Sequence, residues 1–166
     1  ICAQVDGVVQ AVNFNSPGQV VIAGETAAVE AAMALAKEAK AKRALPLPVS
    51  VPSHSSLMLG AAEKLAEKLA KTTIAMPSVP VFHNVSATTT DSVEAINTAL
   101  KEQLDNPVLW VDTVNNLIAA GIETTVECGP GKVLSGLNKR INKAVPALAL
   151  VSPEGMQSVI DELNKA

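Results

Sequence analysis

His54 lies among four serines in the segment LPVSVPSHSSLM, residues 47–58, just before a helix-like pattern. A serine becomes a nucleophile when a base within hydrogen-bond distance accepts its proton and a third group fixes the tautomer of that base. His54 could serve a neighbour, Ser53, Ser55 or Ser56, or a serine from elsewhere. The plainer interpretation is that Ser53 caps the following helix and that His54 makes an ordinary hydrogen bond.

The sequence lacks the pattern that commonly presents a serine nucleophile. Many serine hydrolases hold this residue on a strained strand-to-helix turn with the pattern G-x-S-x-G. Ser16 stands in NSPG and Ser135 in VLSGL, without the flanking glycines. Adjacent side chains at a strand-to-helix junction point in different directions, so a couple between His54 and its neighbours is disfavoured. The residues alone leave the role of His54 open.

The first part of the chain predicts a β–β–α–β order. The β-rich runs 8–15 and 19–24 are separated by Ser16-Pro17-Gly18, a turn signal, and predict an antiparallel hairpin. The alanine-rich run 26–42 predicts a helix. The run 44–51 is expected to be extended, because each proline disfavours helix in the residue before it.

The rest of the chain predicts alternating helices and strands, which is typical of the α/β class. In chain order we expect a helix from Ser53 to Leu69, a strand over 79–87, a helix that begins with a capping box of Asp91 and Glu94, a helix that begins with Asn106-Pro107 and ends near Gly121, a strand over 123–128, a helix over 133–141, a strand over 148–151 and a last helix capped by Ser152-Pro153.

Composition narrows the classes of function. The formal net charge is −3, and two Phe, one Trp and no Tyr leave few rings for base stacking, which argues against a nucleic-acid binder. No apolar run approaches the roughly 20 residues that span a bilayer, so no membrane association is expected. Cys2 and Cys128 form neither a metal pattern nor a disulfide framework. We therefore expect no metal site, reduced thiols and a cytoplasmic location.

Four motifs of the sequence resemble motifs of a known protein family. They are NFNSPGQVVIAG (13–24), LPVSVPSHSSLM (47–58), QLDNPVLW (103–110) and ECGPGKVLSGL (127–137). In this order and at these intervals, the sequence resembles the malonyl-CoA:acyl-carrier-protein transacylase family of bacterial fatty-acid synthesis. The acyltransferase domains of polyketide and fatty-acid synthases share the pattern. The resemblance covers nearly the whole chain and corresponds to the C-terminal half of the family's sequence.

The resemblance implies a fold and a division into two parts. Residues 1–50 would be an incomplete ferredoxin-like small subdomain. Residues 51–166 would be the C-terminal portion of a large α/β subdomain with an α/β-hydrolase-like layered parallel sheet. Because the family's N-terminal half is absent from the sequence, we expect exposed apolar sheet edges and low stability in the isolated chain.

The resemblance also implies roles for individual residues. In the family the nucleophilic serine lies in a G-H-S-x-G elbow upstream of all four motifs, and an arginine further on binds the malonyl carboxylate. Neither motif occurs in these 166 residues. His54 would be the general base for that serine, and the main-chain carbonyl of Gln103 would hold its other ring nitrogen. Asn15 would lie at the edge of the acyl pocket. By residue type alone, Gln103 fits a surface helix end better than this role, and Asn15 fits a turn before Ser-Pro-Gly equally well.

Lys37, Lys40, Lys42 and Arg43 form a local basic cluster on an otherwise acidic chain. The cluster could be a solvated helix end that complements the helix dipole. For this family it could instead dock acidic partners, namely acyl-carrier protein or the phosphates of coenzyme A. His83 is assigned no role.

The function implied is transfer of malonyl from coenzyme A to acyl-carrier protein through a serine ester, with the serine supplied by the N-terminal half of the same enzyme. Malonyl-CoA and the phosphopantetheine thiol are substrates, and no cofactor is expected. The 166 residues alone should then be inactive. Two alternatives remain: a non-catalytic module that binds acyl-carrier protein, and a different serine hydrolase or amidase that uses Ser53, Ser55 or Ser56.

Overall fold

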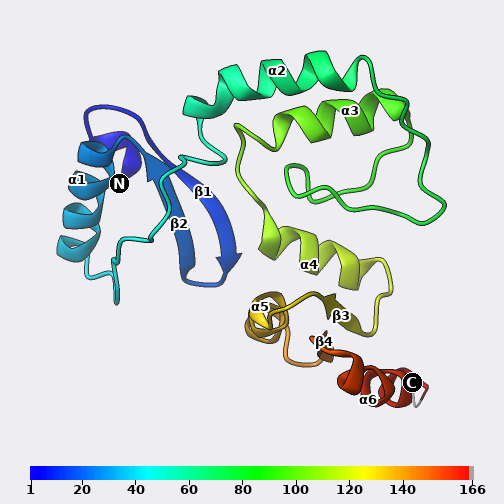
Figure 1. Ribbon diagram of the computed structural model, residues 1–166. Helices are drawn as coiled ribbons and strands as arrows, with labels where there is room; N and C mark the ends of the chain where they lie inside the picture. Colours follow the sequence, from blue (N-terminus) through cyan, green and yellow to red (C-terminus); the bar gives the residue numbers. More distant parts are fainter. Residues whose placement is uncertain (165–166) are drawn as a thin grey trace.

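The computed structural model describes residues 1–164. Figure 1 shows a hairpin flanked by a helix, two helices lying side by side above, and a second group of helices and strands at the opposite corner. The elements in chain order are η1 (Cys2–Gln4), β1 (Val9–Ser16), β2 (Gln19–Gly24), α1 (Thr26–Glu38), η2 (Ser56–Met58), α2 (Leu59–Leu69), α3 (Val93–Glu102), α4 (Trp110–Ala119), β3 (Thr125–Cys128), α5 (Val133–Ile141), β4 (Ala147–Leu150) and α6 (Pro153–Leu163).

The predicted N-terminal hairpin is confirmed. β1 and β2 pair antiparallel from Val9 opposite Gly24 to Ser16 opposite Gln19. Gly18 has φ 76°, a left-handed conformation that glycine adopts without a steric cost. Helix α1 covers the hairpin, and Val9 is buried there with small alanines of that helix. The hairpin and α1 therefore share one small core.

The expected β–β–α–β order is confirmed for its first three elements and wrong at the last, the strand over 44–51. Helix α1 ends at Glu38, short of the predicted residue 42, because Lys40 takes a left-handed conformation with φ 63°. Residues 44–51 are extended in part but form no strand. The segment has no neighbouring strand to pair with in residues 1–164, and Leu45 and Val49 are more than half exposed.

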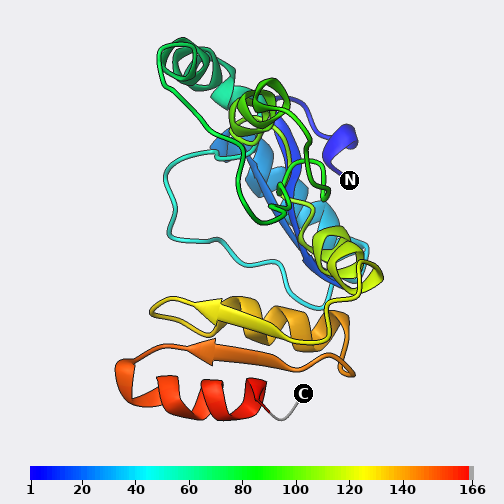
Figure 2. The ribbon, with the colours of Figure 1, turned by 90° about the vertical axis from the view of Figure 1, so that its right-hand side faces the viewer.

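The C-terminal part forms a second small sheet. β3 and β4 pair parallel, from Thr125 opposite Ala147 to Cys128 opposite Leu150. Figure 2 shows the two strands side by side, with α6 running along β4 on the outer side. Ser152 caps α6 and Pro153 opens it, as predicted. The mixed α/β class is confirmed in the form of two separate two-stranded sheets.

A chain of polar contacts joins three of these elements. The indole Nε1 of Trp110 donates to Oδ1 of Asn138 at 3.0 Å, and Nδ2 of Asn138 donates to Oγ1 of Thr125 at 3.2 Å. Asn138 is 9% exposed. Because a buried amide is costly when unpaired, these bonds fix α4, α5 and β3 relative to one another.

Three predicted helix starts are wrong. Ser53 does not cap the next helix, which begins with η2 and continues as α2 from Leu59. Ser92, not Asp91, caps α3 by accepting from the main-chain N–H of Ala95, so Glu94 stands one position too early for a capping box.

Asn106-Pro107 begins no helix, because the chain there pairs with the hairpin. The N–H of Val108 donates to the carbonyl of Val12 at 2.8 Å, and the N–H of Phe14 donates to the carbonyl of Val108 at 2.9 Å. Helix α4 starts only at Trp110 and ends at Ala119, just before Gly121, as expected. This pairing attaches the segment between α3 and α4 to β1.

The strand predicted over 79–87 does not form. Residues 84–88 make a turn in which the N–H of Ala87 donates to the carbonyl of His83 at 2.8 Å. The preceding residues are extended but unpaired. A β-strand needs a neighbour that accepts and donates its main-chain hydrogen bonds, and the described residues offer none to residues 79–82.

Candidate active site

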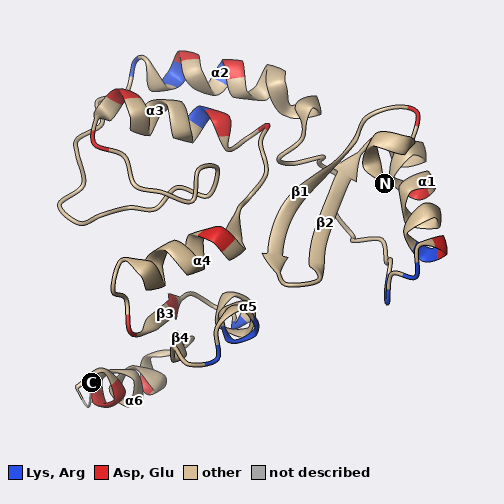
Figure 3. Ribbon diagram, turned by 180° about the vertical axis from the view of Figure 1, so that it is seen from behind, with Lys and Arg blue, Asp and Glu red and all other residues tan. Residues whose placement is uncertain are grey.

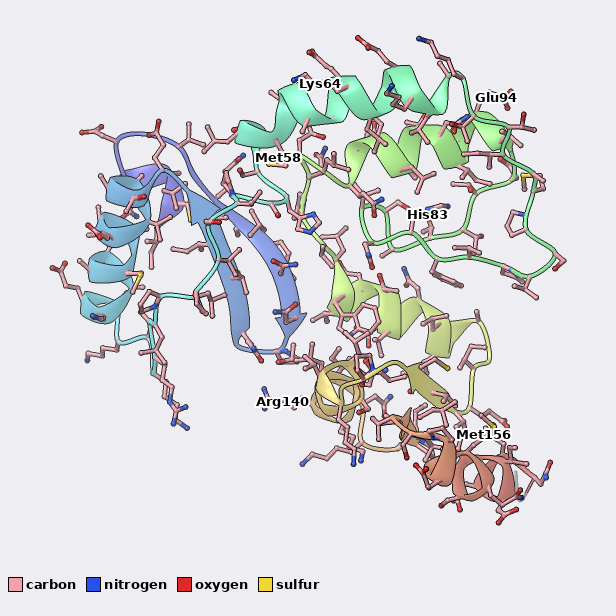
Figure 4. The ribbon with its side chains drawn as sticks, viewed as in Figure 1. Met58, Lys64, His83, Glu94, Arg140 and Met156 are labelled. Atoms are coloured by element: carbon pink, nitrogen blue, oxygen red, sulfur yellow. The ribbon has the colours of Figure 1, made fainter. Side chains whose placement is uncertain are left out.

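His54 lies in the loop between α1 and η2 with a left-handed backbone. Its φ is 65°. Residues other than glycine pay roughly 1–2 kcal/mol for this conformation, and strained residues of this kind cluster at functional sites. Figure 4 shows Met58, which lies where this loop joins α2. The surrounding contacts must hold His54 in place against that cost.

Two carbonyl groups at the end of α3 hold the histidine. The main-chain N–H of His54 donates to the carbonyl of Leu104 at 2.9 Å. The ring atom Nδ1 lies 2.5 Å from the carbonyl oxygen of Gln103. A carbonyl oxygen can only accept, so Nδ1 carries a proton, and in the neutral ring Nε2 keeps its lone pair. This is the tautomer that a general base needs.

The geometry of α3 explains why these carbonyls are available. Gln103 is the C-cap residue, with φ −63° and ψ −15°, and its N–H donates to the carbonyl of Ala99 at 3.1 Å. The last carbonyls of a helix have no partner within it. Gln103 and Leu104 therefore present free acceptors, and His54 occupies both. The contact between His54 and the Gln103 carbonyl matches the one that the family resemblance implies.

The two serines that follow His54, Ser55 and Ser56, make hydrogen bonds to partners other than the imidazole. Ser55 is fully buried, and its Oγ donates to the carbonyl of Pro52 at 2.6 Å. The N–H of Ser56 donates to Oε1 of Gln10 at 2.7 Å. Within residues 1–164 no hydrogen bond joins a serine side chain to the imidazole, and Nε2 has no hydrogen-bond partner there. The geometry offers His54 as a base without supplying its nucleophile.

Gln10 and Leu104 are parts of this site that sequence reasoning missed. Gln10 belongs to β1 and reaches the histidine loop across 46 positions of sequence. Leu104 accepts the hydrogen bond through its main-chain carbonyl, a group that every residue has, so its residue type does not reveal this role. Neither residue type is unusual at its position, so no pattern could have identified them.

The other predicted site residues lie apart from His54. Asn15 is half-buried in β1, beside the irregular pairing between Phe14 and Ser16. Lys40, Lys42 and Arg43 are exposed after α1, and Figure 3 shows Lys and Arg positions where the chain leaves that helix. No hydrogen bond between described residues connects them to the imidazole, so their roles stay predictions.

The second histidine has a local structural role. Nε2 of His83 lies 3.1 Å from Oγ1 of Thr90, and its N–H donates to the carbonyl of Thr88. In residues 1–164 no group of three or more His, Cys, Asp or Glu side chains is placed to hold a metal ion. None of the helices over that range is long and apolar enough to cross a bilayer.

Comparison with known proteins defines the class. The family model described as "Acyl transferase domain" matches residues 1–152. The chain belongs to this family of acyl transferases.

Within the family, the predicted resemblance to malonyl-CoA:acyl-carrier-protein transacylases is confirmed. The chain is 54% identical over 154 residues to the malonyl CoA-acyl carrier protein transacylase of Escherichia coli K12, covering 93% of this chain and 50% of the relative. It is 48% identical over 157 residues to the protein of that name from Bacillus subtilis, covering 95% of this chain and 50% of the relative. The chain thus spans about half the length of the curated relatives it matches.

Solved structures agree with this assignment. The malonyl-CoA:acyl carrier protein transacylase of Xanthomonas oryzae superposes with a TM-score of 0.94 at 47% identity, covering 97% of this chain and 52% of that one. A malonyl-transacylase in complex with a type II polyketide-synthase acyl-carrier protein superposes with a TM-score of 0.95 at 47% identity, covering 97% of this chain and 53% of that one.

Proposed function

We propose that this chain supplies the general base of a malonyl-CoA:acyl-carrier-protein transacylase whose nucleophilic serine lies in polypeptide outside these 166 residues. The observation that carries the proposal is the hydrogen bond between Nδ1 of His54 and the carbonyl of Gln103. It leaves Nε2 as the acceptor, in the tautomer that Ser–His catalysis requires. A neutral carbonyl takes the place that a carboxylate fills in other triads.

The proposed reaction has two steps that use the same imidazole. In the first, Nε2 of His54 takes the serine proton while the serine oxygen attacks the malonyl thioester. The coenzyme A thiolate leaves and receives that proton, and malonyl remains as a serine ester. In the second, His54 takes the proton of the phosphopantetheine thiol, the sulfur attacks the ester, and the serine oxygen regains a proton. No metal or bound organic cofactor is needed.

The state of Ser55 supports an external nucleophile. Oγ of Ser55 is buried and already donates to a carbonyl, so it has no proton to offer the imidazole. The relatives are about twice as long as this chain. The proposed source of the serine is therefore the upstream half of the same polypeptide.

The substrates and partners follow from the relatives. The E. coli protein is named for malonyl-CoA and acyl carrier protein, and one solved relative is bound to an acyl-carrier protein. We assign malonyl-CoA and acyl-carrier protein to this chain by the same proposal. Asn15 would border the acyl group, and Lys40, Lys42 and Arg43 would contact the acidic partner.

The test compares two proteins. One is residues 1–166, and the other, the extended protein, has the same residues preceded by their own upstream segment or by that of the E. coli relative. Transfer of labelled malonyl from coenzyme A to acyl-carrier protein is measured for both. We expect transfer only by the extended protein. Robust transfer by residues 1–166 alone would falsify the external serine.

A further inference from the structure

The side chain of Arg140, on α5, is hydrogen-bonded to the end of the N-terminal hairpin. Its Nη1 donates to Oε1 of Gln19 at 2.8 Å, across 121 positions of sequence. A guanidinium group has donors only, so the atom of Gln19 that faces it is the amide oxygen. Figure 4 shows Arg140 on α5, next to the turn between β1 and β2. This bond joins the first part of the chain to the C-terminal part.

Arg140 extends from a helix that is itself held in place. Asn138 lies two residues earlier in α5, and its amide is bonded to the side chains of both Trp110 and Thr125. Arg140 is exposed, whereas Asn138 is buried. The guanidinium therefore connects the hairpin to an element whose position other contacts already fix.

Gln19 connects this contact to both strands of the hairpin. It is the first residue of β2 and lies opposite Ser16, the last residue of β1. Its Oε1 also accepts from Oγ of Ser16, in a longer contact of 3.4 Å. Ser16 is 4% exposed. One amide oxygen thus accepts from α5 and from the end of β1.

Asn15 lies at a bulge directly beside these contacts. Phe14 pairs with Val20 and Ser16 with Gln19, so β1 has one residue more than β2 at this point, and that residue is Asn15. A bulge changes the direction of the side chain that it carries, and such bulges are frequent next to active sites. The direction of Asn15 therefore depends on how residues 15–19, the hairpin tip, are held.

The bulge lies between two contacts from distant parts of the chain. On one side the N–H of Phe14 donates to the carbonyl of Val108 at 2.9 Å. On the other side Gln19 accepts from Arg140. The first contact attaches β1 to the segment that follows α3, the helix whose end holds His54. The second contact attaches the hairpin tip to α5.

We propose that Arg140 is a positioning residue: through Gln19 it holds the hairpin tip in the conformation that places Asn15 at the acyl group of the substrate. Arg140 itself does not touch the substrate. The place of Asn15 at the acyl group rests on the function proposed above, whereas the bond between α5 and the hairpin is independent of it.

Formation of the malonyl ester by the extended protein tests the proposal without carrier protein. We expect Arg140→Ala and Gln19→Ala each to lower kcat/KM for malonyl-CoA by about three- to tenfold, the usual effect of one lost hydrogen bond. Both changes remove the same bond, so the double variant should lose no more than either single variant. A loss in Arg140→Ala that Gln19→Ala does not reproduce would overturn the proposal in favour of direct contact between Arg140 and coenzyme A.

A second double variant examines the route through Asn15. Arg140→Ala added to Asn15→Ala should cause less than about a twofold further loss, because the group that Arg140 positions is already absent. Losses that multiply would show that Arg140 acts independently of Asn15 and would overturn the proposal. A general loss of stability would also multiply, so this measurement separates positioning from a merely structural role.

Two further variants serve as rescue and control. Gln19→Glu keeps an acceptor oxygen for the guanidinium and should restore most of the rate that Gln19→Ala loses. Lys139→Ala removes a neighbouring cation of α5 that is exposed and makes no hydrogen bond within residues 1–164, and it should change the rate by less than about twofold. Equal losses in Lys139→Ala and Arg140→Ala would contradict a specific role of the bond.

Amide hydrogen exchange separates this inference from the proposed function. In the extended protein, Arg140→Ala should make the peptide 13–21 exchange at least about threefold faster and leave residues 7–11 unchanged. Faster exchange with unchanged ester formation would overturn the positioning role while the proposed function stands. Equal exchange in parent and variant would overturn the bond itself. Faster exchange in a protein whose parent forms no ester would overturn the function and retain only the contact between α5 and the hairpin.

Discussion

The ring of His54 and the main-chain oxygen of Gln103 meet across 49 positions of sequence, with Nδ1 and the oxygen 2.5 Å apart. The acceptor is a main-chain atom, so the side chain at 103 is free to vary as long as the carbonyl keeps its position. The hydrogen bond from the N–H of His54 to Leu104 holds the same pair of segments together. The backbone conformation at 103, rather than the residue type there, therefore determines the orientation and tautomer of the His54 ring.

Changes at 103 and 104 should therefore have opposite outcomes. Gln103→Ala keeps the carbonyl, and we expect transfer by the extended protein to stay within roughly threefold of the parent. Leu104→Pro disfavours the helical conformation that Gln103 now has, so that the carbonyl moves and transfer falls to the level of His54→Ala. Nitrogen NMR of the imidazole should show loss of the fixed tautomer only in the proline variant. A large loss in Gln103→Ala would assign the role to the side chain instead.

Removal of the imidazole should lower transfer by about 10²- to 10⁴-fold, the usual contribution of a general base. His54→Ala and His54→Gly should be equally inactive in the malonyl-transfer assay. The glycine variant should be more stable by about 1 kcal/mol, because glycine relieves the left-handed strain at this position. Recovery of activity in the glycine variant would mean that backbone distortion, and not loss of the base, explains the alanine result.

Gln10 should act as a positioning residue for the histidine loop. Its Oε1 accepts from the N–H of Ser56, two residues after His54. Gln10→Ala should lower kcat by about two- to tenfold, the usual effect of one lost hydrogen bond, while KM stays close to the parent. Gln10→Glu keeps an acceptor oxygen and should restore most of the rate. Equal losses in both variants would rule out this hydrogen bond as the cause.

Glu127 should make stability fall at acidic pH. The N–H of Ser135, at 2.8 Å, lowers the pKa of its carboxyl below the ordinary 4.5, and burial only partly opposes this. The folded state therefore favours the ionised form. Its contribution is present above about pH 4.5 and is lost as the pH falls through the lowered pKa.

Urea unfolding between about pH 3 and pH 7 measures this effect. Glu127→Gln should remove part of the decline in the free energy of unfolding below pH 4.5, the ordinary pKa. Glu123→Gln is the control, because Glu123 is exposed and is not hydrogen-bonded within residues 1–164. An identical pH profile for parent and Glu127→Gln would refute the assignment.

A fluorophosphonate probe should distinguish the transacylase from a hydrolase built on the local serines. We expect no labelling of Ser53, Ser55 or Ser56 in residues 1–166. Ser55 is buried, and among residues 1–164 no serine side chain is hydrogen-bonded to the imidazole. Mass spectrometry of tryptic peptides locates any label. In the extended protein the label should fall on a serine upstream of Ile1. Modification of a local serine that disappears in His54→Ala would support the hydrolase.

The elements that sequence analysis predicted correctly are those whose signals are local. The hairpin depends on its own turn, and α6 on its own Ser152-Pro153 start. The failures depend on distant partners. Asn106-Pro107 has every local feature of a helix start, but Val108 pairs with β1 instead. Residues 79–87 have a strand pattern, but 84–88 turn back on His83, and 79–82 have no main-chain partner among the described residues.

The site residues also fall into two groups, those that the sequence signals and those that only the folded structure reveals. The family resemblance implied the contact between His54 and Gln103, because the motif around each residue can be read from the sequence. Gln10 and Leu104 hold the same loop through contacts that depend on the folded arrangement of β1 and α3. A glutamine on a strand and a leucine after a helix carry no signal of their own.

Trp110, the single tryptophan of the chain, gives the molecule a built-in optical probe. Its indole is hydrogen-bonded to Asn138, so its emission should shift to longer wavelength when α4 separates from α5. The His54 loop contains no competing fluorophore. Tryptophan fluorescence can thus follow the unfolding of α4 and α5, independently of changes at the imidazole of His54.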